Sequence, residues 1–297
     1  MVVAGATLWH TDQTRFSAPE SYRVTSIVCR QLAPSLGDLS ANRELVLGVL
    51  RESVADGAKL VVVPELALSG YMFTSTDEAR EVAITPDHAV FAEWSDAVRD
   101  AGAVAVGGFA ELGSDGLVYN SAAVVDGTGV LAVYRKVHLW DKEKLVFTPG
   151  SVAPPVVETS IGRLGVLICF DLEFPEMPRT LALGGAELIV APTNWPLESV
   201  PEGERVPEVT VGMAAAYSNH VAIAACDRVG VERGQDWNGA SCIIDENGWV
   251  VATADGRGIV AADLDLSRSH DKRLSDLVDL FGDRRPELYG AVTAPKA

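Results

Sequence analysis

Short apolar runs that each end at a reactive side chain constrain the fold of this chain most. The run 165–168 is apolar and contains β-branched residues, which predicts a strand buried on both faces of a sheet. The segment after Cys169 is rich in Asp, Glu and Pro and must leave the sheet, so the cysteine stands at a strand end. Ligands commonly bind at the carboxyl ends of strands in open α/β sheets. Cys169 is therefore a candidate nucleophile, and the alternative is a small buried residue without a chemical role.

Two further runs place polar side chains at equivalent positions. The run 59–63 has a buried-strand pattern and ends in a proline, so Glu65 lies just beyond the strand. In the run 130–139, the alternation places Lys136 at or just past a strand end. Each residue alone has a structural explanation, as a solvated loop charge or as a charge that protects a sheet edge. Because three such positions coincide, we expect Glu65, Lys136 and Cys169 to act together.

Strands and helices alternate along the chain, which predicts an α/β fold with a mixed sheet. Beyond the runs above, the apolar patterns predict strands at 22–30, 103–109, 188–191 and 221–226, and helices at 86–100, 175–183 and 207–218. A further helix is predicted to begin at Asp38 or Ser40 and to stop at Gly57. Turn residues predict one hairpin around 126–129 and another around 246–248.

The residues at these strand ends, with their flanking segments, resemble the nitrilase superfamily of carbon-nitrogen hydrolases, whose members carry Glu, Lys and Cys in this chain order. The resemblance extends from about Tyr22 to Asp265. It is carried by the segments 63–66, 69–71, 134–139, 147–150, 169–171, 174–176, 191–195, 227–230 and 239–245. It implies a four-layer α-β-β-α sandwich with two mixed sheets. Asp227 departs from the asparagine usual in the family, which indicates a subgroup with its own pocket.

The resemblance also implies roles for the residues. Cys169 is expected to be the nucleophile that forms a thioester acyl-enzyme, with Glu65 as its general base and later as general acid. Lys136 and the backbone N–H of Phe170 are expected to stabilise the oxyanion, and the lysine also favours the thiolate. Glu143 best matches a second family glutamate, which positions substrate and steadies the lysine. The alternative for Glu143 is solvated surface, because it stands in a run of charged residues.

The residues after the cysteine bear on the substrate. Phe170 and Asp171 replace the Trp-Glu pair of true nitrilases, so the resemblance favours hydrolysis of a small carboxamide to a carboxylic acid and ammonia. Glu173 stands where branches that bind a substrate carboxylate commonly carry arginine, so we expect a neutral or amine-bearing amide. The predicted substrate-binding residues are Trp140, Phe170, Glu173, Asn194 and Trp195, and the alternative for the tryptophans is ordinary core packing. An N-carbamoyl amine or amino-acid amidohydrolase, an ω-amidase and a nitrilase remain alternatives with the same catalytic set.

Other functional classes stay open. An inactive scaffold could keep the fold, although it would have no need to keep Glu65, Lys136 and Cys169. An acyltransferase or an amidotransferase subunit could pass the acyl group to an amine instead of water. A Cys-His-Asp hydrolase through Cys169 and His220 is formally possible, but the neighbours of neither residue favour it over the lysine and glutamate set.

Composition limits the remaining possibilities. The chain has 297 residues, of which 48% are hydrophobic, and no Ser/Gly/Pro-rich linker divides it, so we predict one domain over 22–297 with a C-terminal tail. Residues 1–21 are predicted to be an N-terminal extension. The formal charge of −17, from 41 acidic and 24 basic residues, opposes binding to nucleic acid or anionic membranes.

The partners and the compartment follow from similar observations. No apolar run approaches the ~18 residues of a membrane span, and the four cysteines lie far apart, so we expect a cytoplasmic protein without a disulfide framework. The five histidines are scattered without metal-ligand spacing and there is no phosphate-binding glycine loop, so we predict neither metal nor cofactor. The expected partners are a small amide, water and further copies of this chain in a homodimer or larger homo-oligomer.

Overall fold

Two six-stranded mixed sheets form the centre of the protein. The computed structural model describes residues 24–294, so the predicted extension 1–21 lies outside the described residues. In spatial order the first sheet consists of β14 (Ile259–Asp265), β1 (Val24–Arg30), β2 (Leu60–Val62), β3 (Val104–Leu112), β4 (Val118–Asp126) and β5 (Gly129–Arg135). The second consists of β13 (Val250–Thr253), β12 (Cys242–Ile244), β9 (Ala222–Cys226), β8 (Leu188–Pro192), β7 (Gly162–Val166) and β6 (Val156–Thr159).

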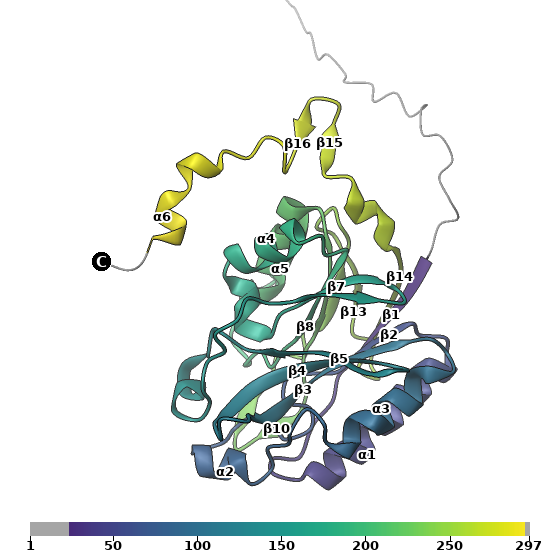
Figure 1. The fold of residues 1–297 in the computed structure, drawn as a ribbon, viewed down its shortest axis with the longest axis vertical. Coiled ribbons are helices and arrows are strands. Elements are labelled where there is room, and N and C mark those ends of the chain that lie inside the picture. Colours follow the sequence, from purple (N-terminus) through teal and green to yellow (C-terminus); the bar gives the residue numbers. More distant parts are fainter. Residues whose placement is uncertain (1–23, 295–297) are drawn as a thin grey trace, which may run out of the picture.

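The sheets pack face to face and helices cover their outer faces (Figure 1). These helices are α1 (Leu39–Ala55) and α3 (Ala89–Arg99) on the first sheet, and α4 (Glu176–Leu183) and α5 (Pro207–Asn219) on the second. Shorter elements are α2 (Thr76–Arg80), η1 (Asp141–Leu145), η2 (Cys169–Glu173), β10 (Val231–Glu232), β11 (Gln235–Asp236), η3 (Leu266–His270), β15 (Arg273–Ser275), β16 (Val278–Asp279), η4 (Pro286–Leu288) and α6 (Gly290–Thr293). The predicted four-layer α-β-β-α sandwich is confirmed.

Each sheet has a parallel centre that antiparallel strands extend. Strands β1, β2 and β3 are parallel, as are β7, β8 and β9. The predicted hairpins follow these centres, with β4 and β5 in the first sheet and β12 and β13 in the second. Because parallel strands end at the same edge of a sheet, the residues just after β2 and β7 can meet where the two sheets face each other.

Alternation along the strands divides the core between the layers. In β2, Leu60 and Val62 face the second sheet and belong to the same apolar cluster as Val166 and Val190. Val61 points the other way, into the cluster that α1 and α3 cover. Burying one such side chain contributes about 1.5–3 kcal/mol to the free energy of folding, so both faces of this short strand stabilise the fold.

Helix α1 shows why its predicted limits hold. The Asp38 side chain accepts a hydrogen bond from the backbone N–H of Ala41 at 2.9 Å, so Asp38, and not Ser40, is the N-cap. Gly57 follows the last turn with φ +96°, a left-handed conformation that favours glycine.

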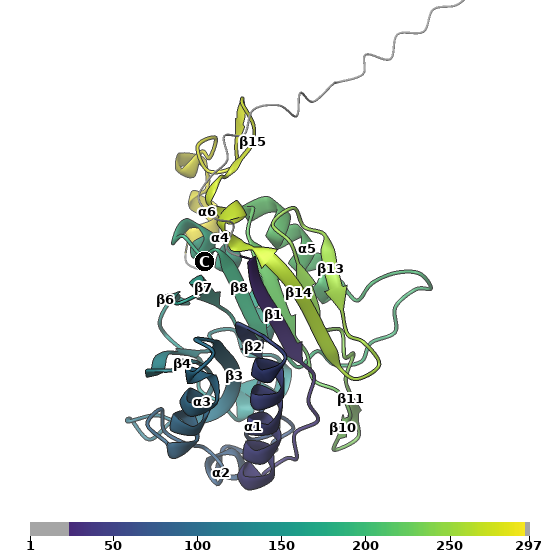
Figure 2. The same cartoon turned by 90° about the vertical axis from the view of Figure 1, so that its right-hand side faces the viewer.

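The C-terminal segment that contains β15, β16 and α6 extends away from the sheets (Figures 1 and 2). It carries exposed apolar side chains, of which Leu277 is 91% exposed. Across residues 24–294, no helix has both the length and the apolar character needed to cross a membrane. The single-domain boundary stays a prediction.

Candidate active site

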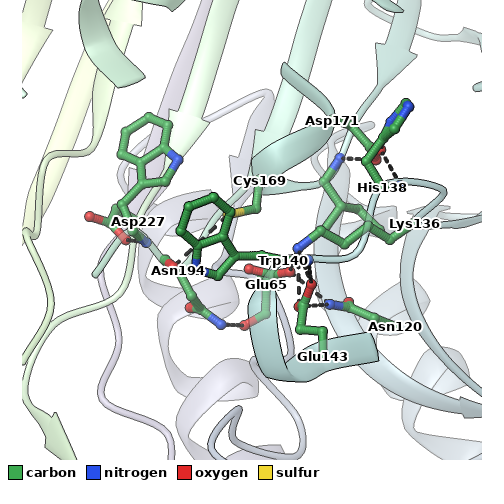
Figure 3. A network of polar contacts seen from close by, with 12 residues as sticks. Glu65, Asn120, Lys136, His138, Trp140, Glu143, Cys169, Asp171, Asn194 and Asp227 are labelled. Atoms are coloured by element: carbon green, nitrogen blue, oxygen red, sulfur yellow. Dashed lines mark hydrogen bonds and ion pairs between the residues drawn. The ribbon is translucent and has the colours of Figure 1, made fainter. Parts of the chain in front are cut away.

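The structure brings Glu65 and Lys136 into direct contact beside Cys169 (Figure 3). Glu65 follows β2, Lys136 follows β5, and Cys169 follows β7 and begins η2. Lys136 Nζ donates to Glu65 Oε1 at 2.6 Å, and neither side chain has any exposed surface. Three strand ends from two sheets therefore place the predicted residues in one buried site.

Glu143 belongs to this site and not to the solvated surface. The lysine also donates to Glu143 Oε2 at 2.8 Å, and the Trp140 backbone N–H donates to the same oxygen at 2.6 Å. Asp141, Lys142 and the other charged neighbours of Glu143 are exposed, because the short turn η1 directs only the glutamate inward. The single ammonium group of Lys136 is thus held between two carboxylates.

Asn120 is a member of the site that sequence reasoning missed. It lies on β4, is fully buried, and its Nδ2 donates to Glu65 Oε1 at 2.7 Å and to Glu143 Oε1 at 2.9 Å. The available signal was an asparagine within the largely apolar run 118–125. Asn120 and Lys136 together satisfy acceptors on both carboxylates, which fixes the spacing of Glu65 and Glu143.

The hydrogen bonds of Asp171 explain why an aspartate stands two positions after the cysteine. Its carboxylate accepts from the Tyr134 hydroxyl at 2.9 Å, from the His138 backbone N–H at 3.0 Å and from the Ile168 backbone N–H at 3.2 Å. These bonds join the segment after β5 to η2, which carries Cys169. The His138 ring lies 2.9 Å from the same carboxylate and stacks on a phenylalanine, so this histidine has a structural role.

Cys169 itself has an unusual backbone conformation. Its φ is +48°, a left-handed value that is uncommon for a residue with a side chain and that occurs often at functional sites. Its Sγ lies 3.9 Å from the carbonyl oxygen of Asn194, whose Nδ2 donates to the Glu65 carbonyl at 3.0 Å. By contrast, the ring of His220 bonds the Asp271 carbonyl at 2.6 Å, so the Cys-His alternative gains no support.

The carbon-nitrogen hydrolase family model matches residues 26–273. The chain is a carbon-nitrogen hydrolase of the nitrilase superfamily. It is 36% identical over 262 residues to a nitrilase of Pyrococcus abyssi, covering 87% of this chain and 97% of the relative. It is 32% identical to an N-carbamoylputrescine amidase of Arabidopsis thaliana, covering 85% and 90%. A solved variant of an amidase from Nesterenkonia sp., with acrylamide added to its active-site cysteine, has a TM-score of 0.72 and 26% identity, covering 90% and 99%.

Burial dominates the electrostatics of the hydrolase. It raises the pKa of Glu65 to about 8, with Lys136 opposing the shift and Glu143 adding to it. For Lys136, burial favours the neutral amine, but the carboxylates of Glu143 and Glu65 outweigh it and raise the pKa well above its usual value. The lysine therefore stays a cation and the glutamate is poised as a base near neutral pH.

Lys136 acts on Cys169 as expected, because its charge lowers the pKa of the thiol, but burial outweighs this effect. Burial, followed by the charge of Glu65, raises the pKa of Cys169 well above its ordinary value, and Lys136 offsets only part of this shift. The same lysine also pairs with the carboxylates of Glu65 and Glu143. The hydrolase therefore holds Cys169 as a thiol until a base removes its proton.

A cavity of about 130 Å³ opens beside Cys169, and we call it the thiol chamber. All five predicted substrate-binding residues line it, together with residues of the following loop and of α5. The lining residues are Trp140, Cys169, Phe170, Glu173, Asn194, Trp195, Pro196, Glu198, Pro207 and Glu208. The rings of Trp140 and Phe170 meet edge to face at 4.8 Å, and Trp195 is 1% exposed, so it serves the core as well as the wall.

The thiol chamber of the hydrolase is acidic. Burial, with the charges of Glu208 and Glu198, raises the pKa of Glu173 to about 7 despite the opposing charge of Lys136. No arginine or lysine lines this chamber among residues 24–294. Sequence reasoning found Glu173 but missed Glu198 and Glu208, because only the fold brings their loop and helix to the same wall.

Proposed function

We propose that this hydrolase cleaves a small carboxamide to a carboxylic acid and ammonia through a thioester on Cys169. The observation that carries the proposal is the buried cation of Lys136, held between Glu65 and Glu143 beside a thiol that lines a substrate-sized chamber. The amidase of Nesterenkonia sp., with acrylamide joined to its cysteine, supports a reactive thiol in this fold.

The first half-reaction forms the thioester. Glu65 removes the Sγ proton as Cys169 attacks the carbonyl carbon, and the carbonyl oxygen becomes an oxyanion that Lys136 and the Phe170 N–H stabilise. Glu65 then gives the proton to the nitrogen, the C–N bond breaks and ammonia leaves. The raised pKa of Glu65 suits both transfers, because the group can accept and return a proton near neutral pH.

The second half-reaction releases the acid. Glu65 accepts a proton from water as the water oxygen attacks the thioester carbon, and Lys136 again faces the oxyanion. When the intermediate collapses, the C–S bond breaks and the proton returns from Glu65 to the sulfur. The acid leaves and the enzyme regains its thiol.

The charge of the thiol chamber supports a neutral or amine-bearing acyl group. Above pH 7, where Glu173 is mostly ionised, the carboxylates of Glu173, Glu198 and Glu208 would repel a substrate that carries its own carboxylate, and they would attract an ammonium group. An N-carbamoyl amine fits the same charge pattern, and a relative at 32% identity is an N-carbamoylputrescine amidase, so this class is the second candidate.

Ammonia release from a substrate panel tests the proposal. The panel contains aliphatic amides, amino-acid amides, N-carbamoyl amines, ω-amides of dicarboxylic acids and simple nitriles, with Cys169→Ala protein as the control. We expect release from neutral or amine-bearing amides that disappears in the variant. A preference for succinamate would contradict the charge argument. Absence of ammonia release from every compound in the panel would favour the scaffold or acyltransferase alternatives.

We also propose assembly into a homodimer or larger homo-oligomer, as the resemblance implies. Exposed apolar side chains on α4, α5 and the C-terminal segment support this, among them Leu183, Tyr217 and Leu277. A monomer mass in light scattering would contradict it. The cytoplasmic location stays a prediction.

A further inference from the structure

A second cavity, of about 110 Å³, adjoins the thiol chamber and has no part in the mechanism above. Trp140, Asn194 and Pro196 line both cavities, so they form the boundary between them. Aromatic rings make much of the remaining wall of this second chamber. The Tyr71 and Trp237 rings meet edge to face at 5.3 Å.

Buried polar groups in the second chamber have unused hydrogen-bonding capacity. Asn194 Oδ1 and Trp237 Nε1 lack hydrogen-bond partners within the described part of the chain, although the residues are only 1% and 7% exposed. Buried polar groups are nearly always paired in folded proteins, so two unpaired groups on one cavity indicate a site for a ligand. Asn194 lines both chambers, so its Oδ1 is an acceptor that could receive an amide N–H from a substrate that spans them.

The position of the proton donor assigns a role to each chamber. Glu65 must protonate the leaving nitrogen, and it shares the donors Lys136 and Asn120 with Glu143. Glu143 lines the second chamber and Cys169 lines the thiol chamber. Because Glu65 shares both donors with Glu143, we place the leaving nitrogen on the side of the second chamber and the acyl substituent in the thiol chamber beside Phe170.

We propose that the second chamber holds the organic substituent of a leaving amine, so that the hydrolase cleaves N-alkyl amides as well as primary amides. This inference rests on the proposed thioester mechanism. Sγ bonds to the carbonyl carbon, Glu65 protonates the nitrogen, the C–N bond breaks and a primary amine leaves in place of ammonia. A cavity of about 150 Å³ accommodates benzene, so this smaller chamber suits a chain of about three or four carbons.

Paired substrates with one acyl group test the proposal. We expect kcat/KM for N-propylpropanamide to lie within about tenfold of that for propanamide. Gln235→Trp fills the second chamber from its partly exposed rim on β11, and we expect it to lower the ratio of the two kcat/KM values at least tenfold. Val231→Trp on the paired strand β10 is the matched control, because Val231 is 65% exposed and lies outside the lining. The proposal would be overturned if the hydrolase cleaved propanamide but not N-propylpropanamide. It would also be overturned if Gln235→Trp left the ratio of the two kcat/KM values unchanged.

A binding measurement separates this proposal from the proposed function. N-Propylpropanamide, which is neutral and which Cys169→Ala protein cannot cleave, is titrated into that protein by calorimetry, with Gln235→Trp or Glu173→Gln added to that background. We expect Gln235→Trp to weaken binding at least tenfold and Glu173→Gln to change it less than threefold. Absence of binding, or loss through Glu173→Gln alone, would overturn the second-chamber proposal. Failure to cleave propanamide or any other amide, with this binding pattern intact, would instead reject the hydrolytic proposal.

Discussion

Two groups of carboxylates flank Cys169, and they differ in whether the protein supplies a cation. Glu65 and Glu143 share the Lys136 ammonium group and the Asn120 amide, which together make five hydrogen bonds to their Oε1 and Oε2 atoms and hold them in position. The second group, Glu173, Glu198 and Glu208, forms the acidic wall of the thiol chamber. No lysine or arginine among the lining residues pairs with these carboxylates.

This difference separates chemistry from specificity. A paired and buried group keeps its geometry through the reaction, which suits proton transfer and oxyanion stabilisation. An unpaired acidic wall leaves its charge available to the substrate, which suits selection between cationic, neutral and anionic acyl groups.

Removing the shared cation should have the largest effect. Lys136→Met leaves two buried carboxylates without their ion pair, so we expect kcat/KM to fall by at least about 10³-fold and the free energy of unfolding to fall by about 3–5 kcal/mol. Amide hydrolysis and urea denaturation measure the two effects. Lys144→Met, at an exposed position in the same segment and outside both chambers, should change neither. A variant that keeps a tenth of the activity would contradict the role of Lys136.

Removing one carboxylate should move the pH profile. Glu143 helps to raise the pKa of Glu65 to about 8, so Glu143→Gln should lower that pKa. Because the base must be deprotonated to act, activity falls as pH drops through its pKa, and the acid limb of kcat/KM should move to lower pH. We also expect about a tenfold loss at the optimum, since Lys136 loses one charged partner. Glu81→Gln, at an exposed position outside both chambers, is the control, and an acid limb that stays in place or moves to higher pH would argue against this coupling.

Removing the bridging amide should affect stability more than chemistry. Asn120→Leu removes one of the two hydrogen bonds to Glu65 Oε1 and one of the two to Glu143 Oε1 and leaves Lys136 as the remaining donor to each, so we expect a loss of about 1–3 kcal/mol in the free energy of unfolding. Denaturant titration measures it. Asn247→Leu, in a surface turn, controls for the side-chain change. Unchanged stability would show that Asn120 does not hold the two carboxylates in place.

Neutralising the wall should have the smallest effect. Glu173→Gln should lower kcat/KM for an amino-acid amide about three- to tenfold and leave that for a neutral amide within twofold, because only a cationic substrate gains from the charge. The preference should also weaken with added salt. Glu176→Gln, at an exposed position on α4, is the matched control. Equal losses for both substrates would indicate that Glu173 shapes the chamber without selecting charge.

Local patterns predicted much of the fold and part of the site. The alternation in 59–63 and 130–139, the cap at Asp38 and the hairpin turns each depend on a few neighbouring residues, and the structure has these elements. The strand ends also predicted Glu65, Lys136 and Cys169 as one group. Glu143 needed the resemblance, because a charged run by itself is typical of solvated surface.

The amino-acid sequence by itself determined the α/β alternation, the family and the identity of the residues beside the thiol. Only the tertiary structure decided that Asn120 bridges two carboxylates from 55 and 23 residues away and that two chambers meet at Asn194. It also decided that Cys169 rests as a thiol, because a pKa depends on burial and on neighbouring charges from every packed element. Strand and turn patterns act over a few residues, whereas desolvation and ion pairing act through space.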